Sequence, residues 1–172
     1  RVTFHHHDVV GAKMVRKRLR ALRFSSEEIK QIALLVELHL RFHGYSDGMF
    51  DDARGWTDSA VRRYVRDAGD QLERLHILTR ADCTTRNQRK ATKLRRAYDE
   101  LEWRIDELAQ QEELMALRPH LDGTQIMAVL DVPPGPVVGQ AYKFLLEARL
   151  EHGPLGEQHA TELLREWWAQ QN

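Results

Sequence analysis

The chain has 172 residues, of which 42% are hydrophobic and 30% are charged, and its 26 Lys and Arg balance its 26 Asp and Glu. This is the composition of a folded, water-soluble protein of one or two domains, and it excludes a disordered chain. The longest apolar run, residues 32–36, is far shorter than the roughly 20 residues that span a membrane, so we expect no membrane partner.

The balanced total charge hides two unequal parts. Residues 1–96 carry 21 Lys and Arg against 12 Asp and Glu, whereas residues 97–172 carry 5 against 14. Two tracts, residues 13–23 and 86–96, each hold six basic side chains and no acid. Such tracts either bind an anionic polymer or form solvated helix faces, and the sequence leaves both interpretations open. The single Cys83 excludes an internal disulfide and favours a cytoplasmic protein.

The first half of the chain has the apolar spacing of amphipathic helices, so we expect an all-α helical bundle. A loose apolar face in the first segment includes Val9 and Met14. Ser25, followed three residues later by Glu28, predicts a capping box that begins the second helix. Glycine and polar residues then predict an exposed loop over residues 45–56, and the next helix begins at Thr57 or Asp58.

A long charged helix is predicted over residues 86–118, ending before Pro119 because the residue preceding a proline is pushed out of the helical region. We expect Glu112 and Glu113 to face water. Asp122 is positioned to cap a following helix, and the turn at residues 131–136 leads into another. A final helix at residues 159–169 carries a tryptophan pair that we expect in the core, Trp167 and Trp168.

The stretch FHHHDVV at residues 4–10 raises the question of a metal site. We do not interpret it as a purification tag, since it continues directly into helical sequence. Metal-dependent phosphohydrolases of the histidine–aspartate class bring several imidazoles and carboxylates to one site, where the metal activates a water molecule. Ingredients of such a site are His7 with Asp8, the pair His39 and His43, and Asp82. The further upstream histidine of that class has no counterpart in this sequence, so the set is incomplete.

Several segments together resemble bacterial CCA-adding tRNA nucleotidyltransferases, in particular the actinobacterial type. They are RVTFHHHDVVGAKMVRKRLRALRFS, LLVELHLRF, WTDSAVRRYVRDAG and LTRADCTTRN, and PHLDGTQIMAVLDVPPGPVVGQAYKFLLEARLEHG also resembles the related poly(A) polymerases. The resemblance implies a C-terminal portion that binds and positions tRNA. Template-independent nucleotide addition would belong to a catalytic head in cis, which uses Mg²⁺ with CTP and ATP and has no counterpart in these residues. The resemblance does not show whether the whole protein adds CCA or a poly(A) tail.

The resemblance also implies a division of the chain and a set of functional residues. Residues 1–85 would form a partial histidine–aspartate-like domain, residues 86–118 a connecting helix, and residues 119–172 a small helical tRNA-binding domain. The expected RNA-binding residues are Arg16, Lys17, Arg20, Arg86, Arg89, Lys90, Lys93, Arg96, Gly135, Gly139 and Lys143. The residues matching the family's metal positions are His7, His39 and Asp82, for a divalent metal. A free-standing phosphohydrolase and a non-catalytic helical interaction module remain as alternatives.

Overall fold

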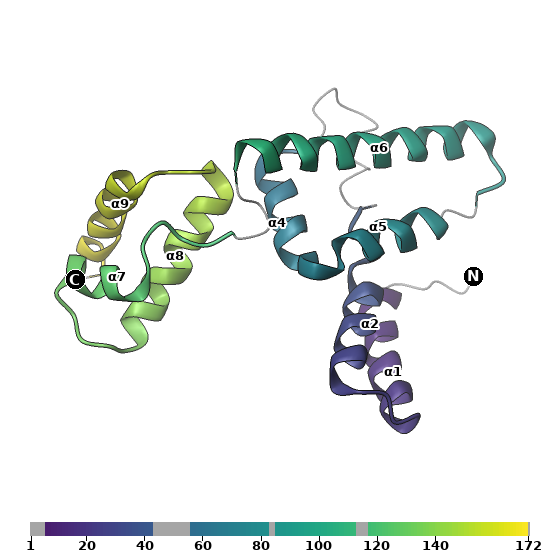
Figure 1. Cartoon of the computed structure of the whole chain (residues 1–172), viewed down its shortest axis with the longest axis horizontal. Helices are drawn as coiled ribbons and strands as arrows, with labels where there is room; N and C mark the ends of the chain where they lie inside the picture. The colour runs from purple at the N-terminus through teal and green to yellow at the C-terminus, as the bar shows by residue number, and fades with distance from the viewer. Residues whose placement is uncertain (1–5, 43–55, 83–84, 113–116, 172) are drawn as a thin grey trace. The chain divides into compact units, whose positions relative to one another are not determined.

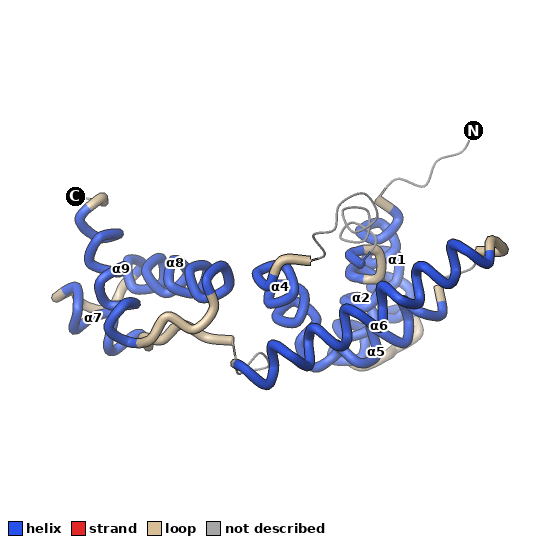
Figure 2. The backbone as a smooth tube through the Cα atoms, turned by 90° about the horizontal axis from the view of Figure 1, so that it is seen from above, coloured by secondary structure: helices blue, strands red, loops and turns tan. Residues whose placement is uncertain are grey.

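The computed structural model describes residues 6–42, 56–82, 85–112 and 117–171, and within these ranges it contains helices and no strand (Figure 2). The all-α prediction is confirmed. The chain packs as two compact units: unit 1 comprises residues 1–57 and 67–105, and unit 2 comprises residues 58–66 and 106–172. The functional division predicted from the sequence is not tested by this packing and stays a prediction.

Unit 1 begins with two helices that pack against each other, α1 (His7–Ala21) and α2 (Ser26–Leu38) (Figure 1). The capping box that begins α2 is confirmed, because the Glu28 amide donates to Ser25 Oγ at 3.2 Å and the Ser25 amide donates to Glu28 Oε2 at 2.9 Å. These two bonds satisfy amides that the first turn of a helix leaves without partners.

The apolar face predicted for the first helix is not the face that packs. Val9 and Met14 are exposed, Met14 at 67% of its surface, whereas Ala12 is completely buried. A Cβ atom built on Gly11 would lie 3.1 Å from Val36 Cγ1, so α1 approaches α2 closely through small residues. The prediction was wrong because it weighed the size of apolar side chains and not the distance between the helix backbones.

The rest of unit 1 is built mainly on α5 (Leu72–Ala81) and on α6 (Gln88–Gln111) as far as Ile105. A short 3₁₀ turn at Gly69–Gln71 precedes α5, and before that turn lies α4 (Asp58–Ala68), whose residues Asp58–Arg66 belong to unit 2. The Tyr98 hydroxyl donates to the Thr79 carbonyl at 3.1 Å, and the rings of Phe42 and Tyr98 stack with centroids 4.0 Å apart. Buried apolar residues of α6 recur at helical spacing, at Leu94, Ala97, Tyr98, Leu101, Ile105 and Leu108.

Unit 2 contains α7 (Gly123–Leu130), α8 (Pro136–His152) and α9 (Glu157–Ala169) around one apolar core. The core residues are Leu121, Ile126, Leu130, Ala141, Leu145, Ala160 and Leu164. Trp167 and Trp168 pack against this cluster, and the ring of Trp167 stacks on Phe144 with centroids 5.6 Å apart. Their predicted structural role is therefore confirmed. The predicted cap of α7 is also confirmed, since Asp122 Oδ1 accepts from the Gln125 amide at 2.9 Å.

Two predictions at the edges of helices were wrong. The long helix ends at Gln111, and Leu117 and Arg118 are not helical, so Pro119 does not terminate it. Trp56, placed in an exposed loop, is only 6% exposed, while residues 43–55 of that loop lie outside the described residues. Within the described ranges, no helix combines the length and the apolar character that crossing a bilayer requires.

Candidate nucleic-acid interface

The first half of α6 presents a basic strip to solvent. We define the basic strip as Arg86, Arg89, Lys90, Lys93 and Arg96, all of which are exposed. Because positions three or four apart lie on one side of a helix, Arg89, Lys93 and Arg96 follow a single line along α6. The buried seam of α6 occupies the other side, so packing within unit 1 holds the strip outward.

Asn87 fixes the backbone at the start of α6, where the basic strip begins. Asn87 Oδ1 accepts from the Lys90 amide at 3.1 Å, and the Asn87 carbonyl accepts from the Ala91 amide at 2.9 Å. Asn87 thus caps the helix in the way that Asn favours at helix N-termini.

Most of the basic strip has no neighbouring acid. Arg86, Arg89, Lys90 and Arg96 form no ion pair with any residue that the structure describes. Mobile counterions from solution therefore neutralise these side chains, and a bound polyanion would release those counterions.

The acidic half of α6 is used within the protein. Arg80 Nη2 lies 2.8 Å from Asp99 Oδ1 and 2.9 Å from Glu102 Oε2. The hydrogen bond with Glu102 is the main reason that the pKa of Arg80 is raised above its ordinary value, against the opposing effect of burial. Asp99 and Glu102 thus hold α5 to α6 through Arg80. The acidic half of α6 therefore has a structural role that differs from that of its exposed basic half.

The first basic tract lies on α1 and is partly paired. Arg16 Nη2 lies 2.9 Å from Glu37 Oε2 of α2, and both side chains are more than 40% exposed. An exposed pair of this kind contributes little to stability and does not prevent Arg16 from meeting a phosphate. Lys17 and Arg20 are exposed.

The third group of predicted RNA-binding residues lies at the start of α8. Gly135 is the N-cap residue, Gly139 lies in the first turns, and Lys143 follows one turn later; all three are exposed. A Cβ atom on Gly139 would meet no described atom within 4 Å, so Gly139 is not required for helix packing within the described structure.

The predicted metal residues are only partly brought together. The rings of His7 and His39 lie with their centroids 5.3 Å apart, edge to face, and His39 Nδ1 lies 2.6 Å from the Val36 carbonyl. Asp82 is exposed at the end of α5, and His43 lies outside the described residues. Across the described ranges, no group of three or more His, Cys, Asp or Glu side chains is placed to hold a metal ion. The described His and Asp side chains do not form a complete metal site, and metal binding stays a prediction.

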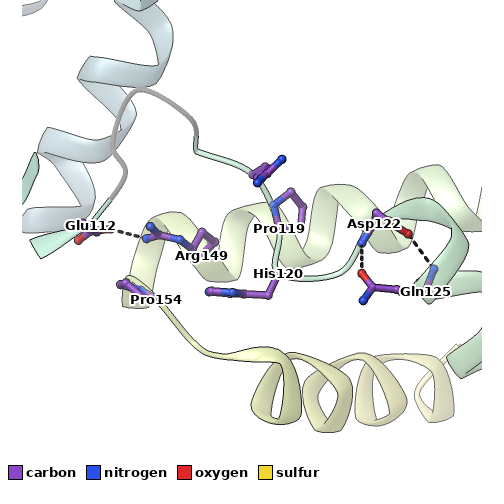
Figure 3. A pocket seen from close by; sticks show the side chains of 8 residues that line it. Glu112, Pro119, His120, Asp122, Gln125, Arg149 and Pro154 are labelled. Atoms are coloured by element: carbon purple, nitrogen blue, oxygen red, sulfur yellow. Dashed lines mark hydrogen bonds and ion pairs between the residues drawn. The ribbon is translucent and has the colours of Figure 1, made fainter.

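A buried charged cluster in unit 2 was not predicted from the sequence. Glu112, expected to face water, is only 8% exposed and joins Arg62 of α4 to Arg149 of α8. Figure 3 shows the contact between Glu112 and Arg149. Arg62 Nε and Nη2 donate to Glu112 Oε1 at 3.0 and 2.9 Å, and Arg149 Nη1 donates to Glu112 Oε2. We call these three residues the buried triad. Glu113 lies outside the described residues.

The buried triad also closes the end of a helix. Arg62 Nη1 donates to the Leu150 carbonyl at 3.2 Å and to the Glu151 carbonyl at 3.4 Å, in the last turn of α8. Burial would raise the pKa of Glu112, but hydrogen bonds and charge from the two guanidinium groups outweigh it and lower that pKa below its usual value. Glu112 therefore stays ionised at neutral pH.

Comparison with known proteins places the chain beside enzymes of tRNA maturation. Over 170 residues, 98% of the chain, it is 32% identical to a CC-adding tRNA nucleotidyltransferase of Thermus thermophilus, of which it covers 34%. Over 171 residues, 99% of the chain, it is 30% identical to an A-adding tRNA nucleotidyltransferase of Deinococcus radiodurans, of which it covers 37%. The chain is similar to part of a bacterial tRNA nucleotidyltransferase.

This similarity to tRNA nucleotidyltransferases agrees with the resemblance found in the sequence. It does not support the finer assignment to the actinobacterial type, because the two relatives come from Thermus and Deinococcus. The chain spans about a third of the length of the curated relatives it matches. No protein-family model matches the chain, and no solved structure matches it significantly.

Proposed function

We propose that this chain is the tRNA-binding, C-terminal portion of a tRNA nucleotidyltransferase, and that nucleotide addition is carried out by a catalytic head elsewhere in the same protein. In this proposal Mg²⁺, CTP and ATP bind to the head. A protein that acts on tRNA would reside in the cytoplasm, as the single cysteine also favours.

The observation that carries the proposal is the chain's similarity to two enzymes that add different nucleotides. The identity is 32% to the CC-adding enzyme and 30% to the A-adding enzyme, in each case over almost all of this chain. Both names have tRNA in common and differ in what is added. A chain about equally similar to both is therefore better explained by the tRNA that both names share than by the choice of nucleotide.

The basic strip of α6 supplies a physical means of binding RNA. Side chains cannot read bases in the deep, narrow major groove of an A-form helix, so proteins recognise duplex RNA mainly through its shape, its phosphates and its 2′-hydroxyls. A line of exposed arginines and lysines on a rigid helix suits phosphate contacts of this kind. Lys17 and Arg20 of α1 and the start of α8, with Gly135, Gly139 and Lys143, are proposed as further contacts.

The test measures the binding of tRNA to the intact chain over a series of salt concentrations. The variant with Arg86→Ala, Arg89→Ala and Lys90→Ala should bind more weakly, and its plot of log affinity against log salt should be less steep by up to about 3, roughly one per lost phosphate contact.

The matched control replaces three basic residues outside the predicted set, Lys30, Arg74 and Arg165, by Ala. These side chains are exposed, and the control should keep the wild-type slope. If the two triple variants show the same slope, the basic strip is a solvated helix face. If wild-type protein shows no salt-dependent binding of tRNA, the chain is better described as a helical interaction module.

A further inference from the structure

A cleft in unit 2, separate from the basic strip, collects hydrogen-bond donors that nothing else in the described structure uses. Its volume is about 570 Å³, within the roughly 300–1,000 Å³ of small-molecule sites. Its lining includes Arg118, His120, Gln125, Arg149 of α8 and Pro154. Figure 3 shows the side chains that line it.

Arg149 is a buried cation with spare donors. Its side chain is only 7% exposed, and its one hydrogen bond within the described residues runs from Nη1 to Glu112. An arginine carries five N–H donors, so the other nitrogens of this guanidinium remain available at the cleft. A buried, oriented guanidinium that neighbours hold in place is well suited to an oxyanion, because its planar fork matches the oxygens of phosphate.

His120 offers a donor of defined position. The Leu155 amide donates to His120 Nε2 at 2.9 Å, so Nε2 carries no hydrogen and the neutral ring holds its hydrogen on Nδ1. Burial, and then the charge of Arg149, lowers the pKa of His120 below its ordinary value, which keeps this tautomer at neutral pH. In Figure 3 the His120 ring extends along the cleft toward Pro154.

The two acids that line the cleft are already engaged by other groups. Both Glu112 oxygens are engaged, one by Arg62 and one by Arg149, so one carboxylate faces two guanidiniums. The other acid, Asp122, caps α7 through its Oδ1. Arg118 adds an exposed guanidinium that forms no ion pair with the described residues. Unused N–H donors of Arg149, His120 and Arg118 therefore remain at the cleft, while the two carboxylates that line it are engaged by other groups.

We infer that this cleft binds a phosphate group of a nucleic acid or a nucleotide, held by Arg149, His120 Nδ1 and Arg118. The inference goes beyond the proposed function because the site lies outside the basic strip and does not depend on it. The N-terminus of α7 does not contribute, since Asp122 already occupies it.

The test follows the Arg149 Nε–H and His120 ring signals of the intact chain by NMR while inorganic phosphate is added. Chloride at the same ionic strength controls for screening. In wild type we expect shifts that saturate with phosphate and not with chloride. Arg118→Gln should weaken phosphate binding about tenfold, as expected for the loss of one charge-assisted contact. Arg165→Gln, which removes an exposed arginine of α9 away from the cleft, should leave it unchanged.

Arg118 is exposed, so its replacement should leave the fold intact, and unchanged amide spectra of the core would verify this. Shifts that never saturate, or that respond equally to chloride, overturn the inference. Equal phosphate affinity in Arg118→Gln and Arg165→Gln also overturns it.

Two further titrations identify the source of the phosphate group. If tRNA displaces inorganic phosphate and a nucleoside triphosphate does not, the ligand is the RNA backbone; the reverse result identifies a nucleotide. Phosphate that neither molecule displaces overturns a biological role for the site. A failure here leaves the salt-dependent binding of tRNA by the basic strip untouched, so the two proposals fail separately.

Discussion

Removal of Glu112 from the buried triad should strongly destabilise the protein. Replacing Glu112 by Ala removes two hydrogen bonds from Arg62 and one from Arg149, and leaves two guanidiniums side by side with side-chain exposures of only 7%. Removing one partner of a buried ionic cluster costs about 3–5 kcal/mol, because the remaining charge has lost its solvation without compensation. We expect Glu112→Ala to lower the free energy of unfolding by an amount in this range. Glu112→Gln keeps one acceptor and should lose less.

The free energy of unfolding is best measured by urea titration with circular dichroism, together with hydrogen exchange at the amides of α8, which reports on unit 2 by itself. The control is Glu107→Ala, since Glu107 is an exposed glutamate of α6, five residues before Glu112, with no ion pair among the described residues. If Glu112→Ala and Glu107→Ala differ by less than about 1 kcal/mol, Glu112 does not hold a buried ionic cluster together.

Three further predictions concern single residues. Gly153→Ala should destabilise unit 2 by about 1–3 kcal/mol in urea unfolding, because Gly153 has φ 81° and an added Cβ would lie 2.8 Å from Arg62 Nη2. Ser25→Ala should lower the free energy of unfolding by about 1 kcal/mol through the lost helix cap, and Ser25→Asp should not. The lowered pKa of His120 means that the unfolded chain binds its proton more readily. Wild type should therefore lose stability as pH falls from about 6.5 to the folded-state pKa, and His120→Gln should lose less over that window. An identical pH dependence in the two proteins would contradict the third prediction.

The features that could be predicted from the sequence are those set by neighbours along the chain. The capping residues Ser25 and Asp122 follow from local spacing, and so do the buried seam of α6 and the outward basic strip. The packing of Trp167 and Trp168 could be predicted because a tryptophan pair on an amphipathic helix has few other ways to leave water.

The features that could not be predicted depend on contacts between distant segments. Glu112 lies 50 residues from Arg62 and 37 from Arg149, and the residues next to it in sequence, Gln111 and Glu113, are polar and acidic. Nothing local separates such a glutamate from those that face water. The same contacts explain why α6 ends at Gln111: Glu112 turns into the triad directly after the helix, several residues before Pro119. A lone Arg within the otherwise apolar spacing of α8 was the one available signal.

Recognition of the body of tRNA by this chain is the proposal on which the function of the basic strip depends. The most direct measurement is competition at physiological salt between tRNA and a B-form DNA duplex with the same number of phosphates, for binding to the wild-type chain. Recognition through A-form shape and phosphate position predicts that tRNA binds more tightly and that the DNA displaces it poorly. Equal displacement by the DNA duplex, or no binding of tRNA at all, would contradict the proposal.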